Sequence, residues 1–164
     1  MEPIDTDLEI EKAFTNLTRA DVPTFTLILG PVASGKTRYR RANYATGAVV
    51  LDAGDLCVSL ARGPIPDELP EYLLATMEIV GQAIARRAIR ERHNLVVEMI
   101  GDQQDATLAV IEHMKTLGYK VDVRAMTVAP DESLRHNEQR GPNNFTAYFT
   151  QDFHLRWLQN VLSD

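Results

Sequence analysis

Residues 24–37 read TFTLILGPVASGKT, and this stretch decides the fold. Its first part, Thr24–Leu29, is an apolar run typical of a buried strand, while residues 36–46 are compatible with a helix. Residues 30–37 between them match the pattern GxxxxGK followed by Ser or Thr in full. A strand, a glycine-containing loop and a helix in this order predict a loop that binds phosphate. We therefore expect the chain to bind a nucleoside triphosphate.

The chemistry of such a loop explains why these residue types are needed. The two glycines allow the backbone to wrap closely around phosphate oxygens, and the following helix directs the positive end of its dipole at the same point. Lys36 would reach the β and γ phosphates, and the Thr37 hydroxyl would bind Mg²⁺. The residues expected to bind the nucleotide are Gly30, Pro31, Val32, Ala33, Ser34, Gly35, Lys36 and Thr37.

Composition describes an ordinary globular chain and limits its partners. With 164 residues, of which 45% are hydrophobic and 24% charged, the chain suits one domain, 1–164. A net charge of −6 argues against a dedicated nucleic-acid binder, although Arg38, Arg40 and Arg41 could form a local basic patch. Cys57 stands alone, and no apolar run is long enough for a membrane span or a signal peptide, so we expect a cytoplasmic protein that binds no membrane. The four histidines show no spacing typical of a metal site, and we expect no structural zinc.

Apolar runs and helical periodicities alternate along the chain. This alternation predicts an α/β protein with the P-loop NTPase fold, in which a mostly parallel sheet of four to five strands lies between two layers of helices. Residues 1–22 indicate an acidic helical extension with Leu8, Ile10 and Phe14 on its apolar face, and residues 130–145 form a candidate lid. The predicted strands are 24–29, 48–52, 94–98 and 119–128, and the predicted helices are 36–46, 56–62, 70–92, 105–117, 131–140 and 150–162.

Three acids follow the ends of predicted strands. Right-handed crossovers bring the carboxyl ends of parallel strands to one edge of a sheet, so we expect Asp52, Asp55 and Glu98 near the phosphate loop. Transfer of a phosphoryl group to a hydroxyl needs one carboxylate that takes the proton and another acid that helps to hold Mg²⁺. Asp55, in a predicted turn after Gly54, is the candidate base. Asp52 is a second catalytic candidate and, with Thr37, a candidate metal ligand.

Other roles stay open for the same acids. Asp52 or Asp55 could cap the short helix that follows, because aspartate is a common N-cap residue. Glu98 could bind the acceptor or the metal, or it could lie at an exposed strand end. Arg62, at the end of the short helix, is a further candidate for binding the acceptor together with Glu98 and Asp55.

Two arginines in the second half of the chain are candidates for stabilising the transferred phosphoryl group. Arg135 and Arg140 lie in the predicted helix 131–140, just before the break GPNN at 141–144, and such a segment can close over a nucleotide as a lid. We expect Arg135 to contact the nucleotide and Arg140 to act in catalysis, with a solvated helix face as the alternative for both. Trp157 in the last helix is expected in the core.

Four blocks of the sequence stand in a specific order and spacing. They are the loop GPVASGKT, the strand and acids VVLDAGD, the strand HNLVVE and the segment GYKVDVRAMTVAPDESLRHNEQR. Together they resemble the zeta-toxin family of P-loop kinases, over about residues 24–152. Members are similar in fold to adenylate-type and shikimate-type kinases, and the best-known ones use ATP and Mg²⁺ to phosphorylate the 3′-hydroxyl of UDP-N-acetylglucosamine. The resemblance therefore implies ATP and Mg²⁺ as cofactors and a small antitoxin-like protein inhibitor as a partner.

The resemblance also implies roles for single residues, and these agree with the roles inferred above. Lys36 and Thr37 would bind ATP and Mg²⁺. Asp55 would be the general base, Glu98 would contact the sugar nucleotide, and Arg140 would be the first arginine of the lid.

The sequence departs from the family pattern at three points. The acid pair DxD is one residue longer here, at 52–55, which leaves open which aspartate is the base. Met99 and Ile100 stand where the family has glycine and threonine, and no second lid arginine follows between 141 and 151. Two hypotheses follow: a kinase of a small hydroxylated molecule, such as a sugar nucleotide, an antibiotic or a nucleoside, or an ATP-binding module with little turnover that acts through a protein partner. A polynucleotide kinase is a third alternative, which the net charge disfavours.

Overall fold

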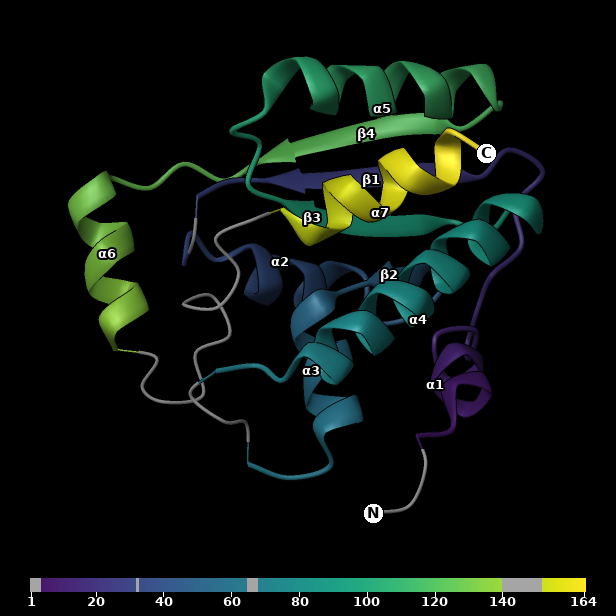
Figure 1. Cartoon of the computed structure of the whole chain (residues 1–164). Helices are drawn as coiled ribbons and strands as arrows, with labels where there is room; N and C mark the ends of the chain where they lie inside the picture. Colours follow the sequence, from purple (N-terminus) through teal and green to yellow (C-terminus); the bar gives the residue numbers. More distant parts are fainter. Residues whose placement is uncertain (1–3, 32, 65–67, 140–151) are drawn as a thin grey trace.

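The central element of the molecule is a sheet of four parallel strands in the order β2-β3-β1-β4 (Figure 1). The computed structural model describes residues 4–31, 33–64, 68–139 and 152–164. Leu27 of β1 pairs with Val97 of β3 on one side and with Val123 of β4 on the other, so the strand that leads into the phosphate loop is flanked on both sides. The strands are β1 Thr24–Leu29, β2 Val49–Leu51, β3 Leu95–Met99 and β4 Lys120–Ala125.

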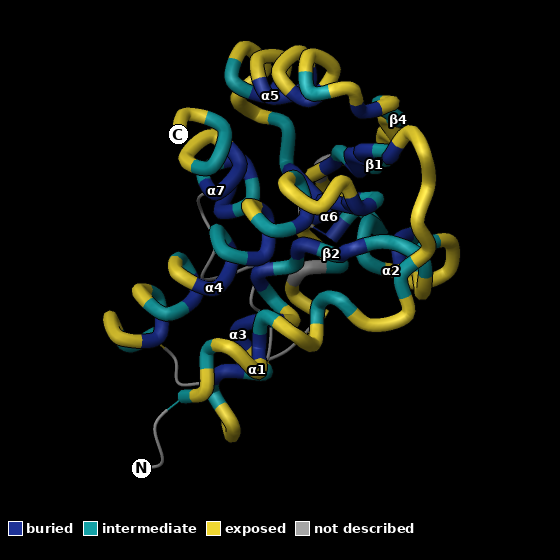
Figure 2. The backbone as a smooth tube through the Cα atoms, turned by 90° about the vertical axis from the view of Figure 1, so that its right-hand side faces the viewer, coloured by how far each residue is buried: buried dark blue, intermediate teal, exposed yellow. Residues whose placement is uncertain are grey.

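Helices cover both faces of this sheet. Seen from the side, α4, α5 and α7 lie on one side of the strands and α2 lies on the other (Figure 2). Right-handed crossovers produce this arrangement, because α2 leads from β1 outward to β2 whereas α4 leads from β2 back to β3. The predicted three-layer α/β/α fold is confirmed. The helices are α1 Thr6–Lys12, α2 Lys36–Asn43, α3 Ala53–Ala61, α4 Glu71–Arg90, α5 Gln104–Thr116, α6 Pro130–Glu138 and α7 Phe153–Leu162.

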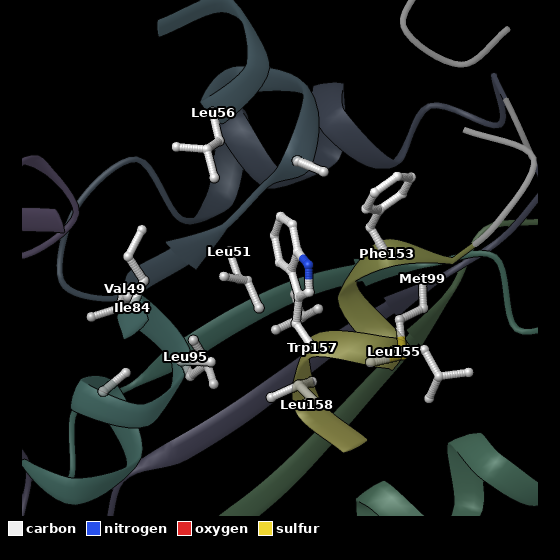
Figure 3. Packing of buried hydrophobic residues seen from close by; sticks show 14 of the residues in the cluster. Val49, Leu51, Leu56, Ile84, Leu95, Met99, Phe153, Leu155, Trp157 and Leu158 are labelled. Atoms are coloured by element: carbon white, nitrogen blue, oxygen red, sulfur yellow. The ribbon is translucent and has the colours of Figure 1, made fainter. Parts of the chain in front are cut away.

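The hydrophobic core fills the space between the sheet and the layer that contains α4 and α7. All five residues of β3 are buried, which agrees with its apolar sequence. Figure 3 shows Trp157 of α7 among side chains of β2, β3 and α4, and the residue is fully buried. Gly81 of α4 lies against it, because a Cβ atom at this glycine would come within 2.5 Å of the indole ring. The core position predicted for Trp157 is confirmed, and the glycine lets the two helices approach closely.

Helix α3 begins earlier than the sequence indicates. Gly54 and Asp55 are predicted in a turn before a helix that begins at Leu56, but both lie in the first turn of α3, so this prediction is wrong. The physical reason is the N-cap residue Asp52, whose side chain accepts a hydrogen bond from the Asp55 N–H at 2.9 Å. Such a bond satisfies one of the free N–H groups at a helix start, so α3 can begin directly after β2.

The predicted apolar face of the helical extension is confirmed in part, because Ile10 of α1 and Phe14 just beyond it are partly buried and pack against the core. Leu8, expected on the apolar face, is 50% exposed, whereas Glu9 is buried. Glu9 accepts a hydrogen bond from Ser59 Oγ at 2.5 Å, which links α1 to the end of α3. Phe14, just beyond α1, packs against His93, which precedes β3. The helical extension therefore lies toward the edge where the strands begin, away from the phosphate loop (Figure 1).

The candidate lid is described in part. Helix α6, Pro130–Glu138, forms close to its predicted place. Residues 140–151, which include the predicted lid arginine Arg140, lie outside the described residues.

No helix in the described part of the chain has both the length and the apolar character that a membrane crossing requires.

Candidate functional site

The phosphate loop connects β1 to α2 at the carboxyl edge of the sheet. Gly30 is in a crowded position, because a Cβ atom there would come within 2.6 Å of Ser34 Oγ and within 2.9 Å of the Met126 carbonyl oxygen. Gly35 has open space around it, but its φ of +91° is one that residues with a side chain rarely adopt. The backbone thus requires both glycines of the motif, the first for space and the second for its dihedral angle.

The beginning of α2 is suited to an anion. Gly35 is the N-cap residue of α2 and offers no side chain to the free N–H groups of the first turn. Ser34 Oγ beside it is buried and, within the part of the chain that the structure describes, has no hydrogen-bond partner. A phosphate group would satisfy this hydroxyl and the backbone donors together, and the helix dipole would favour its charge. The loop therefore fits the triphosphate that its sequence predicts; Val32 lies outside the described residues.

Lys36 lies over the same loop. Its Nζ donates hydrogen bonds to the carbonyl oxygens of Gly30, at 2.6 Å, and of Pro31, at 2.7 Å. The ammonium group is thus held beside the turn whose N–H groups would face the phosphates. This placement supports the role that the motif predicts for the lysine.

A buried arginine gathers the three acids that the sequence predicts at this edge. Arg40 Nε donates a hydrogen bond to Glu98 at 2.6 Å, while Arg40 Nη2 donates to Asp52 and, at 3.2 Å, to Asp55. The Thr37 hydroxyl, one turn earlier on α2, donates to the other Glu98 oxygen at 2.9 Å. We name Arg40, Asp52, Asp55 and Glu98 the Arg40 cluster. It joins α2, α3 and the ends of β2 and β3 directly beside the phosphate loop.

Arg40 is the functional residue that the sequence interpretation missed. Only 5% of Arg40 is exposed. The suggestion that Arg38, Arg40 and Arg41 form a basic surface patch is therefore wrong for Arg40. Burial by itself would lower the pKa of Arg40, but Asp52 and the other two acids outweigh burial and raise this pKa above its ordinary value. The one sequence signal was its spacing of three residues from Thr37, which places both side chains on one face of α2.

The two aspartates differ in how their oxygens are used. One oxygen of Asp52 accepts from the Asp55 N–H and the other from Arg40, and the side chain is 12% exposed. The alternative that Asp52 caps the next helix is therefore confirmed, while its role as a metal ligand stays a prediction. Asp55 accepts from Arg40 and, at 3.0 Å, from Arg41, yet its side chain is 53% exposed. Asp55 is the aspartate that a molecule in solution reaches more easily.

Glu98 is the acid in direct contact with Thr37. It is 8% exposed, so the alternative of an exposed strand end is wrong. Its carboxylate bridges the Thr37 hydroxyl and the Arg40 guanidinium. An Mg²⁺ ion bound by Thr37 would lie within reach of this carboxylate, directly or through a water molecule.

The described part of the structure does not bring two of the predicted arginines, Arg62 and Arg135, to this site. Arg62 is exposed and follows the last residue of α3, whereas Asp55 lies in the first turn of this helix. The helix has 9 residues and is therefore about 13.5 Å long. Arg135 is exposed on α6. Arg140 lies outside the described residues, and the roles of all three arginines stay predictions.

Comparisons with known proteins identify relatives of this arrangement. A family model described as zeta toxin matches residues 7–161. A solved structure from the PezAT chromosomal toxin–antitoxin system of Streptococcus pneumoniae matches with a TM-score of 0.64 and 14% identity, over 98% of this chain and 71% of that chain. A structure of the Pnkp1/Rnl/Hen1 RNA repair complex matches with a TM-score of 0.56 and 14% identity, over 89% of this chain and 47% of that chain. At such identity the likeness shows the fold alone. No curated protein matches the sequence.

Proposed function

Because the chain belongs to the zeta-toxin family, we propose that it is an ATP- and Mg²⁺-dependent phosphotransferase that moves the γ-phosphate to a hydroxyl group of a small molecule. The observation that carries this proposal is the hydrogen bond from Thr37 to Glu98, which joins the phosphate loop to the Arg40 cluster. One edge of the sheet thereby combines a cradle for a triphosphate, a hydroxyl suited to Mg²⁺ and an accessible carboxylate. These are the parts that phosphoryl transfer requires.

The phosphate loop would bind and orient the nucleotide. The N–H groups after Gly35 and the Ser34 hydroxyl would hold phosphate oxygens, and Lys36 would turn from the loop carbonyls to the β and γ phosphates. Thr37 would hold Mg²⁺, which would supply positive charge to stabilise the transferred group. Glu98 would keep the Thr37 hydroxyl in position for the metal, as acids around a metal ligand commonly do.

Asp55 is the proposed general base. Its accessible carboxylate, at the start of α3, would accept the proton of the acceptor hydroxyl. The new bond from that oxygen to the γ phosphorus forms as the bond from phosphorus to the bridging oxygen of ADP breaks. Arg40 and Arg41 would hold the aspartate, and Arg140 would stabilise the charge of the transferred group.

The acceptor and the partner are proposed from the family. We take a sugar nucleotide, with UDP-N-acetylglucosamine as the first candidate, for the acceptor. A small antitoxin-like protein is the proposed partner, and the match to a structure from a toxin–antitoxin system supports this choice.

One observation favours a second function. Both oxygens of Asp55 already accept hydrogen bonds from arginines, Arg40 at 3.2 Å and Arg41 at 3.0 Å. An acceptor hydroxyl would have to share these oxygens or displace an arginine. The alternative is therefore an ATP-binding module with little turnover, whose output is a contact with a protein partner.

A transfer experiment separates the two functions. Purified chain is incubated with Mg²⁺ and ATP labelled at the γ-phosphate, together with UDP-N-acetylglucosamine, related sugar nucleotides, nucleosides or aminoglycosides. Lys36→Ala serves as the blank, and Asp55→Asn tests the base. A labelled product that disappears in both variants, with ATP binding kept in Asp55→Asn, supports the kinase. Tight ATP binding without any labelled acceptor supports the binding module instead.

A further inference from the structure

The first turn of α7 reaches the edge of the sheet where the Arg40 cluster lies. His154 Nε2 accepts a hydrogen bond from the Ala53 N–H at 2.7 Å, and His154 Nδ1 lies 2.6 Å from the Glu98 carbonyl oxygen. The last paired residues of β2 and β3 are Leu51 and Val97. The imidazole therefore stands between the two strand ends just beyond the point where their direct pairing stops.

The two backbone groups decide where the ring carries its proton. A backbone N–H can only donate, so the Nε2 atom that faces Ala53 has to be the unprotonated nitrogen. A neutral imidazole then carries its proton on Nδ1, which faces the Glu98 carbonyl oxygen, a group that can only accept. One tautomer of His154 thus satisfies both neighbours. The other tautomer would place a donor against a donor and a lone pair against a carbonyl oxygen.

Each backbone group that His154 binds belongs to an element that carries the acids. Ala53 is the first residue of α3, the helix that Asp52 caps and that carries Asp55 in its first turn. Glu98 supplies the carboxylate that holds the Thr37 hydroxyl. The ring therefore ties the beginning of α3 to the end of β3 at the level of the site.

Other residues of α7 hold this bridge in place. Asp152, the buried N-cap residue of α7, accepts a hydrogen bond from the Ile100 N–H at 3.0 Å. The beginning of α7 is therefore hydrogen-bonded to the chain at a second point, just after β3. The Trp157 ring, with its centroid 5.6 Å from that of the imidazole, packs edge-on against it. Trp157 is itself fully buried, which leaves the imidazole little freedom to turn.

We propose that His154, in its neutral Nδ1–H tautomer, is a positioning residue of this site: it sets the separation between the acids of α3 and Glu98 without touching the nucleotide. The effect on Mg²⁺ and nucleotide binding rests on the function proposed above. The hydrogen-bonded bridge itself does not.

The bridge is tested by NMR on the full-length chain labelled with ¹⁵N. We expect the His154 imidazole of the folded chain to show an unprotonated Nε2 and a protonated Nδ1, and a scalar coupling across the hydrogen bond between Ala53 N and His154 Nε2. The exposed His113 on α5 provides the reference ring. A proton on Nε2, or a ring without coupling to Ala53, would overturn the proposal.

The positioning role is tested with His154→Leu, which removes both hydrogen bonds, and with His154→Asn, whose amide can still donate to Glu98. We expect His154→Leu to weaken binding of ATP with Mg²⁺ by about 10-fold, as loss of supporting groups around a metal site commonly does. Binding of ATP in EDTA should change less than about twofold, because the phosphate loop is untouched. His154→Asn should recover part of the loss, and His113→Leu should show none.

The outcomes separate the inference from the proposed function. Equal weakening of both forms of ATP would mean that His154 is only structural and would overturn the positioning role. If His154→Leu does not fold, as judged by circular dichroism, the same comparison is made with His154→Asn. If the wild-type chain binds ATP neither with Mg²⁺ nor in EDTA, the proposed function is overturned, and the positioning role with it. The NMR measurements of the His154 tautomer and of the coupling to Ala53 still decide whether the bridge exists.

Discussion

The phosphate loop and the Arg40 cluster lie side by side at the carboxyl edge of the sheet, but they are built in different ways. The loop consists of consecutive residues, 30–37, and its shape follows from its own glycines and backbone. The cluster joins residues far apart in sequence, since Arg40 and Glu98 are 58 positions apart. The bridge from α7 is longer still, with 101 positions between Ala53 and His154.

This difference teaches which substitutions should change activity alone and which should change activity and stability together. Replacing Lys36 in the loop removes a group that would face the nucleotide and leaves the hydrophobic packing intact. Replacing a buried member of the cluster, such as Arg40, leaves buried charges without partners, so it changes the fold and the chemistry together.

Arg40→Met gives the largest expected effect. It removes the cation between Asp52 and Glu98 and leaves two little-exposed carboxylates near one another, which we expect to lower the free energy of unfolding by about 3–5 kcal/mol. Urea unfolding followed by circular dichroism measures this. Arg41→Met is the matched control, because the Arg41 side chain is 65% exposed and its ion pair is worth about 1 kcal/mol or less. Equal losses in the two variants would contradict the distinction between cluster and surface.

For Lys36→Ala we expect a large loss of activity and little loss of stability. We expect phosphoryl transfer to fall by about 10²- to 10³-fold, because a charge contact to the transferred group is lost. The free energy of unfolding should change by less than about 0.5 kcal/mol. Transfer assays and urea unfolding on the same preparation check both expectations. A variant that keeps its transfer rate, or that loses stability as Arg40→Met does, would break the comparison.

Gly81→Ala tests the support that α7 receives from the core. The added methyl group would come within 2.5 Å of the Trp157 ring, so the helices α4 and α7 must move apart. We expect a loss of about 1–3 kcal/mol in the free energy of unfolding. In Gly63→Ala the nearest atom to the new Cβ is 4.0 Å away, and this control should stay close to wild type. A Gly81→Ala chain as stable as the control would show that this contact is not tight.

Cys57 on α3 provides the last test, through pH. Burial raises the pKa of the Cys57 thiol from 9.0 to about 11. Because the folded chain holds its proton more strongly than the unfolded chain does, this contribution to stability is complete below pH 9 and is lost as the pH rises from 9 to about 11.

The expected loss over that range is about 1–3 kcal/mol, measured as the difference in urea unfolding between wild type and Cys57→Ala at each pH. The same folded thiol should react slowly with a thiol reagent at pH 8. Rapid labelling of the folded chain, or a difference between the two chains that does not vary with pH, would show that α3 opens more readily than the packing indicates.

Sequence reasoning was most successful where the physics is local. The strand Thr24–Leu29 has the same bounds in the structure as in the prediction, because an apolar run before a glycine loop leaves few alternatives. Glu98 and Asp55 were expected near the loop from topology alone, and the structure places both there. The turn predicted at Gly54 was wrong because the N-cap bond of Asp52 begins the helix one turn earlier.

The roles of Arg40 and His154 could not be predicted in the same way. Arginines in the last turn of a helix are usually solvated. The spacing from Thr37 does not reveal that acids at the start of α3 and in β3 converge on Arg40. His154 belongs to no recognised motif. Its two hydrogen-bond partners are backbone groups, which every residue has, so no residue type in the sequence indicates them.

By itself, then, the sequence determined the alternating α/β architecture, the phosphate loop and the membership of a kinase-like family, because strand runs, helical periodicity and loop geometry each depend on neighbours within a few residues. Only the tertiary structure decided that Arg40 is buried, that Asp52 and Asp55 use their oxygens differently, and that α7 reaches the site through His154. The physical reason is that these arrangements depend on which hydrogen-bond donors and acceptors meet when distant elements pack, and this pairing leaves no periodic trace in the order of the residues.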